Sequence, residues 1–133
     1  MKVHNLSETN SVVNHFLAEI RNVNIQNDRM RFRRNIERIG EILAYEMSKS
    51  LHFSSEEIQT PLSEIKANLI DDKVVVCSIL RAGVPLHNGI LNYFDWVDSS
   101  FISAYRYHIS ETEFEIKVEF LASQNLDNKV LIL

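Results

Sequence analysis

One stretch of this chain restricts its possible folds more than any other, a nearly continuous apolar run over residues 74–80. A strand with one face in water alternates apolar and polar residues, whereas this run, VVVCSIL, is apolar at almost every position. Runs of this kind are typical of strands in parallel sheets that are covered on both faces. We therefore expect residues 74–80 to form a central strand of an α/β protein.

The segments that follow complete a strand-helix-strand unit. A loop over residues 81–85 comes directly after the strand, and residues 86–94 have the composition and length of a short helix. Residues 101–107 then read as the next strand, so residues 74–107 have the size of a crossover between parallel strands. We expect this crossover to be right-handed, as nearly all such connections are.

Helical periodicity dominates the first third of the chain. Apolar residues recur at helical spacing after Asn10 and Ser11, which are good N-cap residues, so a short amphipathic helix is expected there. A longer apolar stripe runs over residues 32–47 and predicts a second helix, with Asn27 or Asp28 as its N-cap.

Strand periodicity appears in three further segments. Residues 63–70 alternate apolar and polar side chains, which indicates a half-exposed hairpin or arm, with Pro61 at an edge or in a turn. Residues 114–120 alternate apolar and charged side chains, as expected of a strand at a sheet edge or at the mouth of a site. Residues 129–133 begin another apolar strand.

These elements predict an α/β fold with a mostly parallel sheet, flanking helices, an N-terminal helical segment and a protruding β-arm. We divide the chain into a helical part over residues 1–50, an arm over residues 54–72 and an α/β core over residues 73–133. The absence of repeats and of a linker rich in Pro, Gly or Ser predicts a single domain.

Composition excludes several classes of function. The net charge of −4 disfavours general affinity for nucleic acid, and no run approaches the roughly 18 apolar residues that span a bilayer. The single cysteine, Cys77, lies in the apolar run and is expected to be a small buried packing residue. We therefore expect a cytoplasmic protein with no membrane and no nucleic-acid partner.

A cluster of arginines is the exception to this charge balance. Its members are Arg29, Arg31, Arg33, Arg34 and Arg38. Such a cluster could contact an anionic partner, but it also fits a solvated helix face that is paired with Glu37, Glu41 and Glu46. We favour the paired helix face.

The loop after the central strand is the best candidate for chemistry. Gly83 would allow close approach of backbone N–H groups to a ligand, and the following helix directs its positive end toward the same place. Arg81 adds a planar cation that suits two phosphate oxygens. Judged by itself, an arginine near a glycine at such a turn also fits a helix cap or a surface residue.

Arg106 is the second candidate, because it lies at the carboxyl end of the next expected strand, where it would converge with Arg81 on one crevice. It could equally pair with Glu111 or Glu113. His108 could bind phosphate or transfer a proton, although an exposed loop histidine is the more common outcome. The other histidines show no spacing typical of metal ligands, so no metal is assigned to protein side chains.

In their order along the chain, these motifs resemble the uracil phosphoribosyltransferase family over nearly the whole sequence. The matching segments are Phe32-Arg33 with residues 39–46, residues 58–62, residues 78–83, and Ala104-Tyr105-Arg106 with the acidic Glu111 and Glu113. They are similar, in turn, to the family's long N-terminal helix, the start of its β-arm, its pyrophosphate-binding loop, and its second substrate-contacting arginine with the mobile loop.

The resemblance implies transfer of a phosphoribosyl group from 5-phospho-α-D-ribose 1-diphosphate to N1 of uracil, giving uridine monophosphate and pyrophosphate. It implies Mg²⁺ bound together with the diphosphate, a homodimer formed through the β-arm, and diphosphate contacts from Arg81, Ala82, Gly83 and Arg106. No residue of the chain is assigned a catalytic role. By analogy with related pyrophosphate loops, we also predict that the Leu80–Arg81 peptide bond can be cis.

The sequence also departs from the family pattern. Val84 and Pro85 replace the usual glycine-containing continuation of the arginine loop. The family's acidic phosphate loop and its later uracil-recognising segment would lie beyond Leu133, so we expect a truncated chain that has no activity by itself. The alternative is a non-catalytic dimerising protein, or an RNA-binding pyrimidine regulator, on the same fold.

Overall fold

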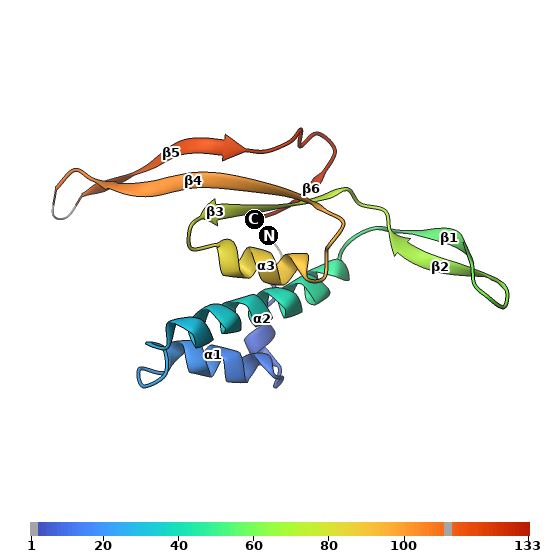
Figure 1. The fold of residues 1–133 in the computed structure, drawn as a ribbon, viewed down its shortest axis with the longest axis horizontal. Helices are drawn as coiled ribbons and strands as arrows, with labels where there is room; N and C mark the ends of the chain where they lie inside the picture. The colour runs from blue at the N-terminus through green and yellow to red at the C-terminus, as the bar shows by residue number, and fades with distance from the viewer. Residues whose placement is uncertain (1–2, 111–112) are drawn as a thin grey trace.

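The computed structural model describes residues 3–110 and 113–133 as a four-stranded sheet with helices packed on one side and a separate two-stranded hairpin (Figure 1). Helix α3 lies between the sheet and α2, and α1 lies against α2 on the side away from the sheet (Figure 1). The core between the sheet and the two nearer helices is centred on Ala44, Val76, Ile90 and Phe94.

The N-terminal helices follow the predicted pattern. After a short 3-10 turn (η1, Leu6–Glu8), α1 spans Val13–Arg21 and α2 spans Arg29–Ser48. Of the two residues proposed as the N-cap of α2, the structure selects Asp28, whose Oδ1 accepts hydrogen bonds from the N–H groups of Met30 and Arg31 at 3.1 and 3.0 Å. This cap satisfies two of the donors that a helix start leaves unpaired.

The main sheet has the strand order β5-β4-β3-β6. The strands β3 (Val74–Leu80), β4 (Asp98–His108) and β6 (Val130–Ile132) are parallel, which confirms that the three apolar runs share one sheet and that β3 is central. The peptide bond between Leu80 and Arg81 is cis, as predicted. Helix α3 (Val84–Leu91) begins two residues earlier than expected and has Pro85 in its first turn, where a missing N–H costs little.

The prediction of a mostly parallel sheet was wrong, because the sheet is mixed. Strand β5 (Phe114–Ala122) is the predicted edge strand, but it runs antiparallel to β4, and their ladder, from Phe101↔Ala122 to His108↔Phe114, is the longest in the sheet. Only a few residues separate β4 from β5, and a connection that short can join antiparallel strands only. Among the described residues the helices also cover one face of the sheet, whereas cover on both faces was expected (Figure 1).

Strands β1 (Phe53–Gln59) and β2 (Glu64–Ile70) pair antiparallel in a hairpin that extends away from the main sheet (Figure 1). Pro61 lies in its turn, as expected, and the Thr60 hydroxyl closes the turn by donating to the Ser63 carbonyl at 2.6 Å. At the base of the hairpin, the His52 N–H donates to Asp72 Oδ2 at 2.7 Å and lowers the pKa of that carboxyl group. The use of this hairpin as an arm toward a second subunit stays a prediction.

Two glycines allow α2 and α3 to pack closely. A Cβ added to Gly89 would overlap the carbonyl of Glu37, and one added to Gly40 would lie 2.5 Å from the carbonyl oxygen of Leu86. The two backbones are therefore too close to admit even a methyl group. This contact fixes the position of α3, and with it the loop that precedes α3.

A buried polar contact also ties α3 to the sheet. His87 is 3% exposed, and its ring bridges two strands: Nδ1 lies 2.8 Å from Ser78 Oγ on β3, and Nε2 lies 3.0 Å from Ser99 Oγ on β4. Burial lowers the pKa of His87, so the neutral ring is favoured. A neutral imidazole has one donor and one acceptor, and a hydroxyl can supply either role, so both ring nitrogens are satisfied.

We expect Gly89→Ala to lower the free energy of unfolding by about 1–3 kcal/mol, because the added methyl group must push two helix backbones apart. The matched control is Asn88→Ala, an exposed change at the neighbouring position of α3, which should change stability little. Urea unfolding followed by circular dichroism measures both. Equal stability of the two variants would show that the helices can separate at little cost.

The pKa of His87 gives stability a defined pH dependence. Because this pKa is lowered in the folded chain, the unfolded chain binds more protons below its ordinary pKa of about 6.5. The free energy of unfolding should therefore fall as pH drops below that value, until the folded ring is protonated too. Urea unfolding between about pH 7.5 and 5 should show this fall, and His87→Asn should flatten it. Identical pH profiles would contradict the assignment.

Candidate functional site

The loop that carries Arg81, Ala82 and Gly83 lies at the carboxyl end of β3, the place where ligands bind in open α/β sheets. Arg81 and Ala82 are exposed, and Gly83 leads into α3. The positive end of the α3 dipole points back at this loop. The structure thus puts the predicted loop residues together at the predicted edge of the sheet.

Gly83 has a packing role in the loop that the sequence did not suggest. Its backbone is in the ordinary right-handed helical region, and its N–H donates to the Ile79 carbonyl at 3.1 Å, so this donor is already used. A Cβ at Gly83 would lie 2.9 Å from that same carbonyl oxygen and 3.3 Å from Ser78 Cβ. Glycine is therefore needed here so that the loop can fold back onto β3.

Two other backbone donors remain free for a ligand. Within the described part of the chain, the N–H groups of Arg81 and Ala82 have no hydrogen-bond acceptor. The Arg81 guanidinium likewise has no ion-pair or hydrogen-bond partner among those residues. One permanent cation and two N–H dipoles at a helix start favour an anion with several oxygens.

A hollow of about 520 Å³ opens beside this loop. Ala82, Gly83 and Leu80 line it on one side, and Leu43 and Met47 of α2 line it on another. Most of its walls are apolar. A ligand that is held by the loop at a charged end would have an apolar surface next to it, which is the usual composition of a small-molecule site.

Arg106 lies on β4, the parallel neighbour of β3, so the adjacency inferred from sequence is confirmed. Its guanidinium stacks on the Phe114 ring at 4.2 Å from the centroid. Ser103 is the partner of Leu80 in the ladder, so Arg106 lies three residues farther along, or about 10 Å. The two arginines thus share one edge of the sheet, but this structure does not bring them into contact.

The residues near Arg106 give no further support for chemistry. The ring of His108 lies 6.3 Å from that of Phe114, and the Glu113 carbonyl accepts from Ile109 and Ser110 in the turn between β4 and β5. Glu111 lies outside the described residues. The alternative pairing of Arg106 with Glu113 does not occur among the ion pairs of the described residues.

His87 was missed in the sequence, although a signal existed. Ser78 is the one hydroxyl in the apolar run of β3, and a buried hydroxyl needs a partner. His87 follows Gly83 by four residues, one helical turn, which places it under the loop. Cys77, by contrast, is a buried packing residue as expected, and burial raises the pKa of its thiol.

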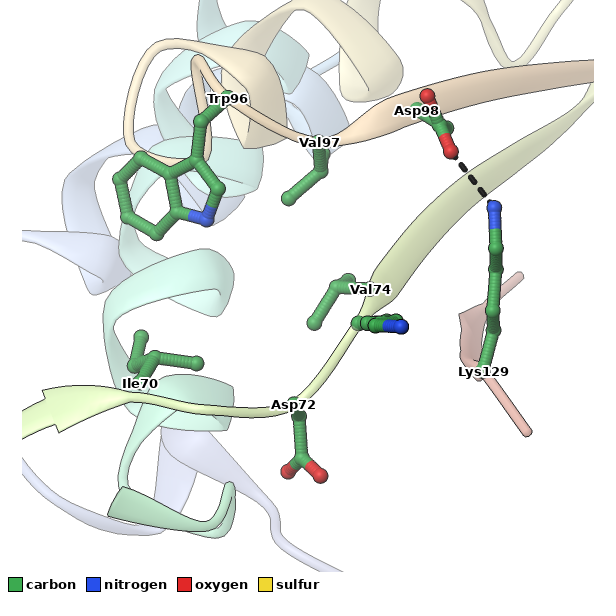
Figure 2. A pocket seen from close by; sticks show the side chains of 8 residues that line it. Ile70, Asp72, Val74, Trp96, Val97, Asp98 and Lys129 are labelled. Carbon is green, nitrogen blue, oxygen red and sulfur yellow. Dashed lines mark hydrogen bonds and ion pairs between the residues drawn. The ribbon is translucent and has the colours of Figure 1, made fainter. Parts of the chain in front are cut away.

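A second hollow, of about 260 Å³, lies at the opposite end of the strands (Figure 2). Trp96 and Ile70 flank one side, and an ion pair between Lys129 Nζ and Asp98 Oδ2, 2.7 Å long, closes the other (Figure 2). Asp98 and Lys129 are thus paired with each other, whereas Asp72, which also lines the hollow, is bonded to His52. This hollow surrounds the amino ends of β3 and β4, so it is separate from the loop at residues 81–83.

The arginine cluster on α2 is largely engaged within the chain. Arg34 pairs with Glu37 at 2.7 Å and lowers the pKa of that carboxyl group, and Arg31 pairs with Glu19 at 3.0 Å. Arg38 donates to Asn35 and lies over the Phe16 ring. In residues 3–110 and 113–133, no three His, Cys, Asp or Glu side chains gather as metal ligands, and no helix is both long and apolar enough to cross a bilayer.

The fold resembles that of a solved structure. The chain is similar to a solved structure, the AQ2163 protein from Aquifex aeolicus, with a TM-score of 0.79 and 22% sequence identity over 92% of this chain and 57% of that one. At this identity the likeness supports the fold alone. It agrees with the mixed α/β architecture described above.

Sequence comparison identifies the family. The chain is 48% identical over its whole length to a uracil phosphoribosyltransferase from Porphyromonas gingivalis, of which it covers 62%. It is 33% identical over 102 residues to a uracil phosphoribosyltransferase from Methanococcus maripaludis, a match that spans 75% of this chain and 43% of the relative. The chain thus spans less than two thirds of the length of these relatives. The family model described as uracil phosphoribosyltransferase matches residues 7–133, and the chain belongs to this family.

Proposed function

We propose that the chain is the part of a uracil phosphoribosyltransferase that binds the diphosphate of 5-phospho-α-D-ribose 1-diphosphate. The observation that carries this proposal is the unpaired Arg81 guanidinium beside the free N–H groups of Arg81 and Ala82, at the carboxyl end of β3. The reaction gives uridine monophosphate and pyrophosphate. Both its substrates and its cytoplasmic location are inferred from the relatives and from the sequence.

The chemistry of the reaction explains why such donors are useful. As the bond from the ribose carbon to the diphosphate breaks, positive charge develops on the sugar and negative charge on the departing pyrophosphate. Fixed cations and N–H dipoles stabilise that negative charge without having to reorganise during the step. Arg81 and the two free N–H groups are placed to do this. Arg106 would contact the same substrate only if the β4–β5 ribbon or the ligand bridges the separation along β4.

Mg²⁺ is proposed as a companion of the diphosphate. The loop offers hydrogen-bond donors and a cation, which suit phosphate oxygens and not a metal ion. The ion would therefore arrive coordinated by the diphosphate, whose charge it partly neutralises. Residues 81–83 would hold the remaining oxygens.

Arg81→Ala tests the proposed contact. In a polypeptide of the relatives' full length that carries these residues, we expect a loss on the order of 2–4 kcal/mol of transition-state stabilisation, with a smaller effect on uracil binding. Arg81→Lys should recover only part of it, because an ammonium lacks the planar fork. Steady-state conversion of labelled uracil measures both variants, and the 133-residue chain by itself should give no turnover. An unaffected Arg81→Ala variant would make Arg81 a surface residue.

The alternative of an RNA-binding regulator has less support. It depended on the arginine cluster at residues 29–38, and three of those five arginines are held by Glu19, Glu37, Asn35 or Phe16.

A non-catalytic dimerising protein remains the second candidate, since it would use the β1–β2 hairpin as well. The binding of the diphosphate substrate separates the two functions.

We also propose that the β1–β2 hairpin contacts a second subunit. One face of the hairpin carries Ile65 and Leu69, which stay 47% and 40% exposed, and the turn carries Leu62, which is 96% exposed. Figure 1 shows the hairpin extending away from the sheet and helices. Apolar residues on such an extension favour burial against a partner.

Ile65→Asp with Leu69→Asp should shift the protein from dimer to monomer in sedimentation, because two charges would be buried at the contact. Ser55→Asp is the matched control, since it adds a charge to the opposite face of the same hairpin. It should leave the dimer intact. A monomeric parent protein, or a dimer that survives the double change, would remove the hairpin from the interface.

A further inference from the structure

The polar chain from Ser78 through His87 to Ser99 lies directly under the loop at residues 81–83. The backbone N–H of His87 donates to the Gly83 carbonyl at 2.9 Å, so the last residue of the loop and His87 belong to one helical turn. The side chain of His87 then reaches down to both β3 and β4. One residue therefore joins the loop, the strand before it and the neighbouring strand.

The contacts of Ser78 connect this chain to the loop itself. Its Oγ bonds His87, and its Cβ lies where Gly83 folds back onto β3, at 3.3 Å from the position of an added Cβ. Gly83 is also bonded to Ile79, the next residue of β3. The position of Ser78 relative to His87 thus sets how the loop closes on β3.

The bridge has a structural role, because the buried Ser78 hydroxyl needs a hydrogen-bond partner. His87 is buried with its ring centroid 4.8 Å from that of Phe101, and an apolar side chain in its place would leave the buried Ser78 hydroxyl without a partner. At 3% exposure the ring does not reach solvent, so it does not exchange protons with a substrate. The imidazole instead holds α3 at a fixed distance from β3 and β4.

We propose that His87 is a positioning residue whose ring, through its contact with Ser78, sets the loop at residues 81–83 against β3 so that Arg81 and the free N–H groups face one anion. This inference rests on the proposed function, in which that loop binds a diphosphate. The contact with Ser78 carries the effect, because Ser78 lies on β3 beside Gly83, where an added Cβ would come within 3.3 Å of the Ser78 Cβ. The contact with Ser99 holds the far side of the ring.

The two ring nitrogens can be tested separately. An asparagine places its amide near the position of Nδ1, so His87→Asn can keep the bond to Ser78. A glutamine reaches the position of Nε2, so His87→Gln can keep the bond to Ser99 and lose the one to Ser78. Ser78→Ala and Ser99→Ala remove the same two contacts from the strand side.

The experiment measures the loop and its ligand on the 133-residue chain. The amide resonances of Arg81, Ala82 and Gly83 report the loop geometry by ¹H–¹⁵N spectroscopy, and calorimetric titration with inorganic pyrophosphate reports its affinity. His87→Gln and Ser78→Ala should move these resonances and weaken pyrophosphate binding about tenfold, because a loop that is no longer held in place must be ordered when the ligand binds. His87→Asn, Ser99→Ala and the control Asn88→Ala should stay within about twofold of the parent chain.

The outcomes separate the two proposals. If a folded parent chain does not bind pyrophosphate, the proposed function fails, and the loop resonances still decide the role of His87. If His87→Gln and Ser78→Ala lose thermal stability but keep the parent's loop resonances, His87 is a packing residue and the inference is overturned. Equal effects of His87→Asn and His87→Gln would also overturn it, because only one of them can keep the contact with Ser78.

Discussion

Strand β3 is the constraint on which the rest of this structure depends. It pairs with β4 on one side and with β6 on the other, and Val74 to Cys77 are all buried. A strand so enclosed can present ligand groups only where it ends. The loop at residues 81–83 is that end, and its position follows from three separate restraints: the β3–β4 ladder, the close contact of α2 with α3, and the bridge through His87.

The sequence allowed much of the fold to be predicted, because its signals are local. Three segments show a clear hydrophobic pattern: a continuous apolar run over residues 74–80, a helical stripe over residues 32–47 and an alternation over residues 114–120. Asp28 was one of two residues proposed as a cap, and the choice between it and Asn27 depended on backbone geometry that no sequence pattern encodes. Elements were therefore predictable to within a few residues at their ends.

The errors came from interactions between elements. The sheet was expected to be mostly parallel because apolar runs suggest that arrangement, yet the length of the connection between β4 and β5 decides the direction of β5. Gly83 was expected to let backbone N–H groups approach a ligand, and the structure adds a packing role, because its own N–H donates to Ile79 and its missing Cβ allows contact with β3. His87 was overlooked since its two partners lie on different strands.

The candidate site shows why an anion loop needs support from beneath. Arg81 and Ala82 are exposed, so water weakens the attraction between their donors and an anion. If the donors also had to be oriented on binding, the loss of conformational entropy would offset much of that attraction. A loop with free backbone donors cannot hold itself rigid by those same donors. Its rigidity has to come from groups that do not touch the ligand, and here these are the Gly83 contact with Ile79 and the buried hydroxyl–imidazole bridge. Because the buried groups bond to each other, the exposed donors of Arg81 and Ala82 are left free for a ligand.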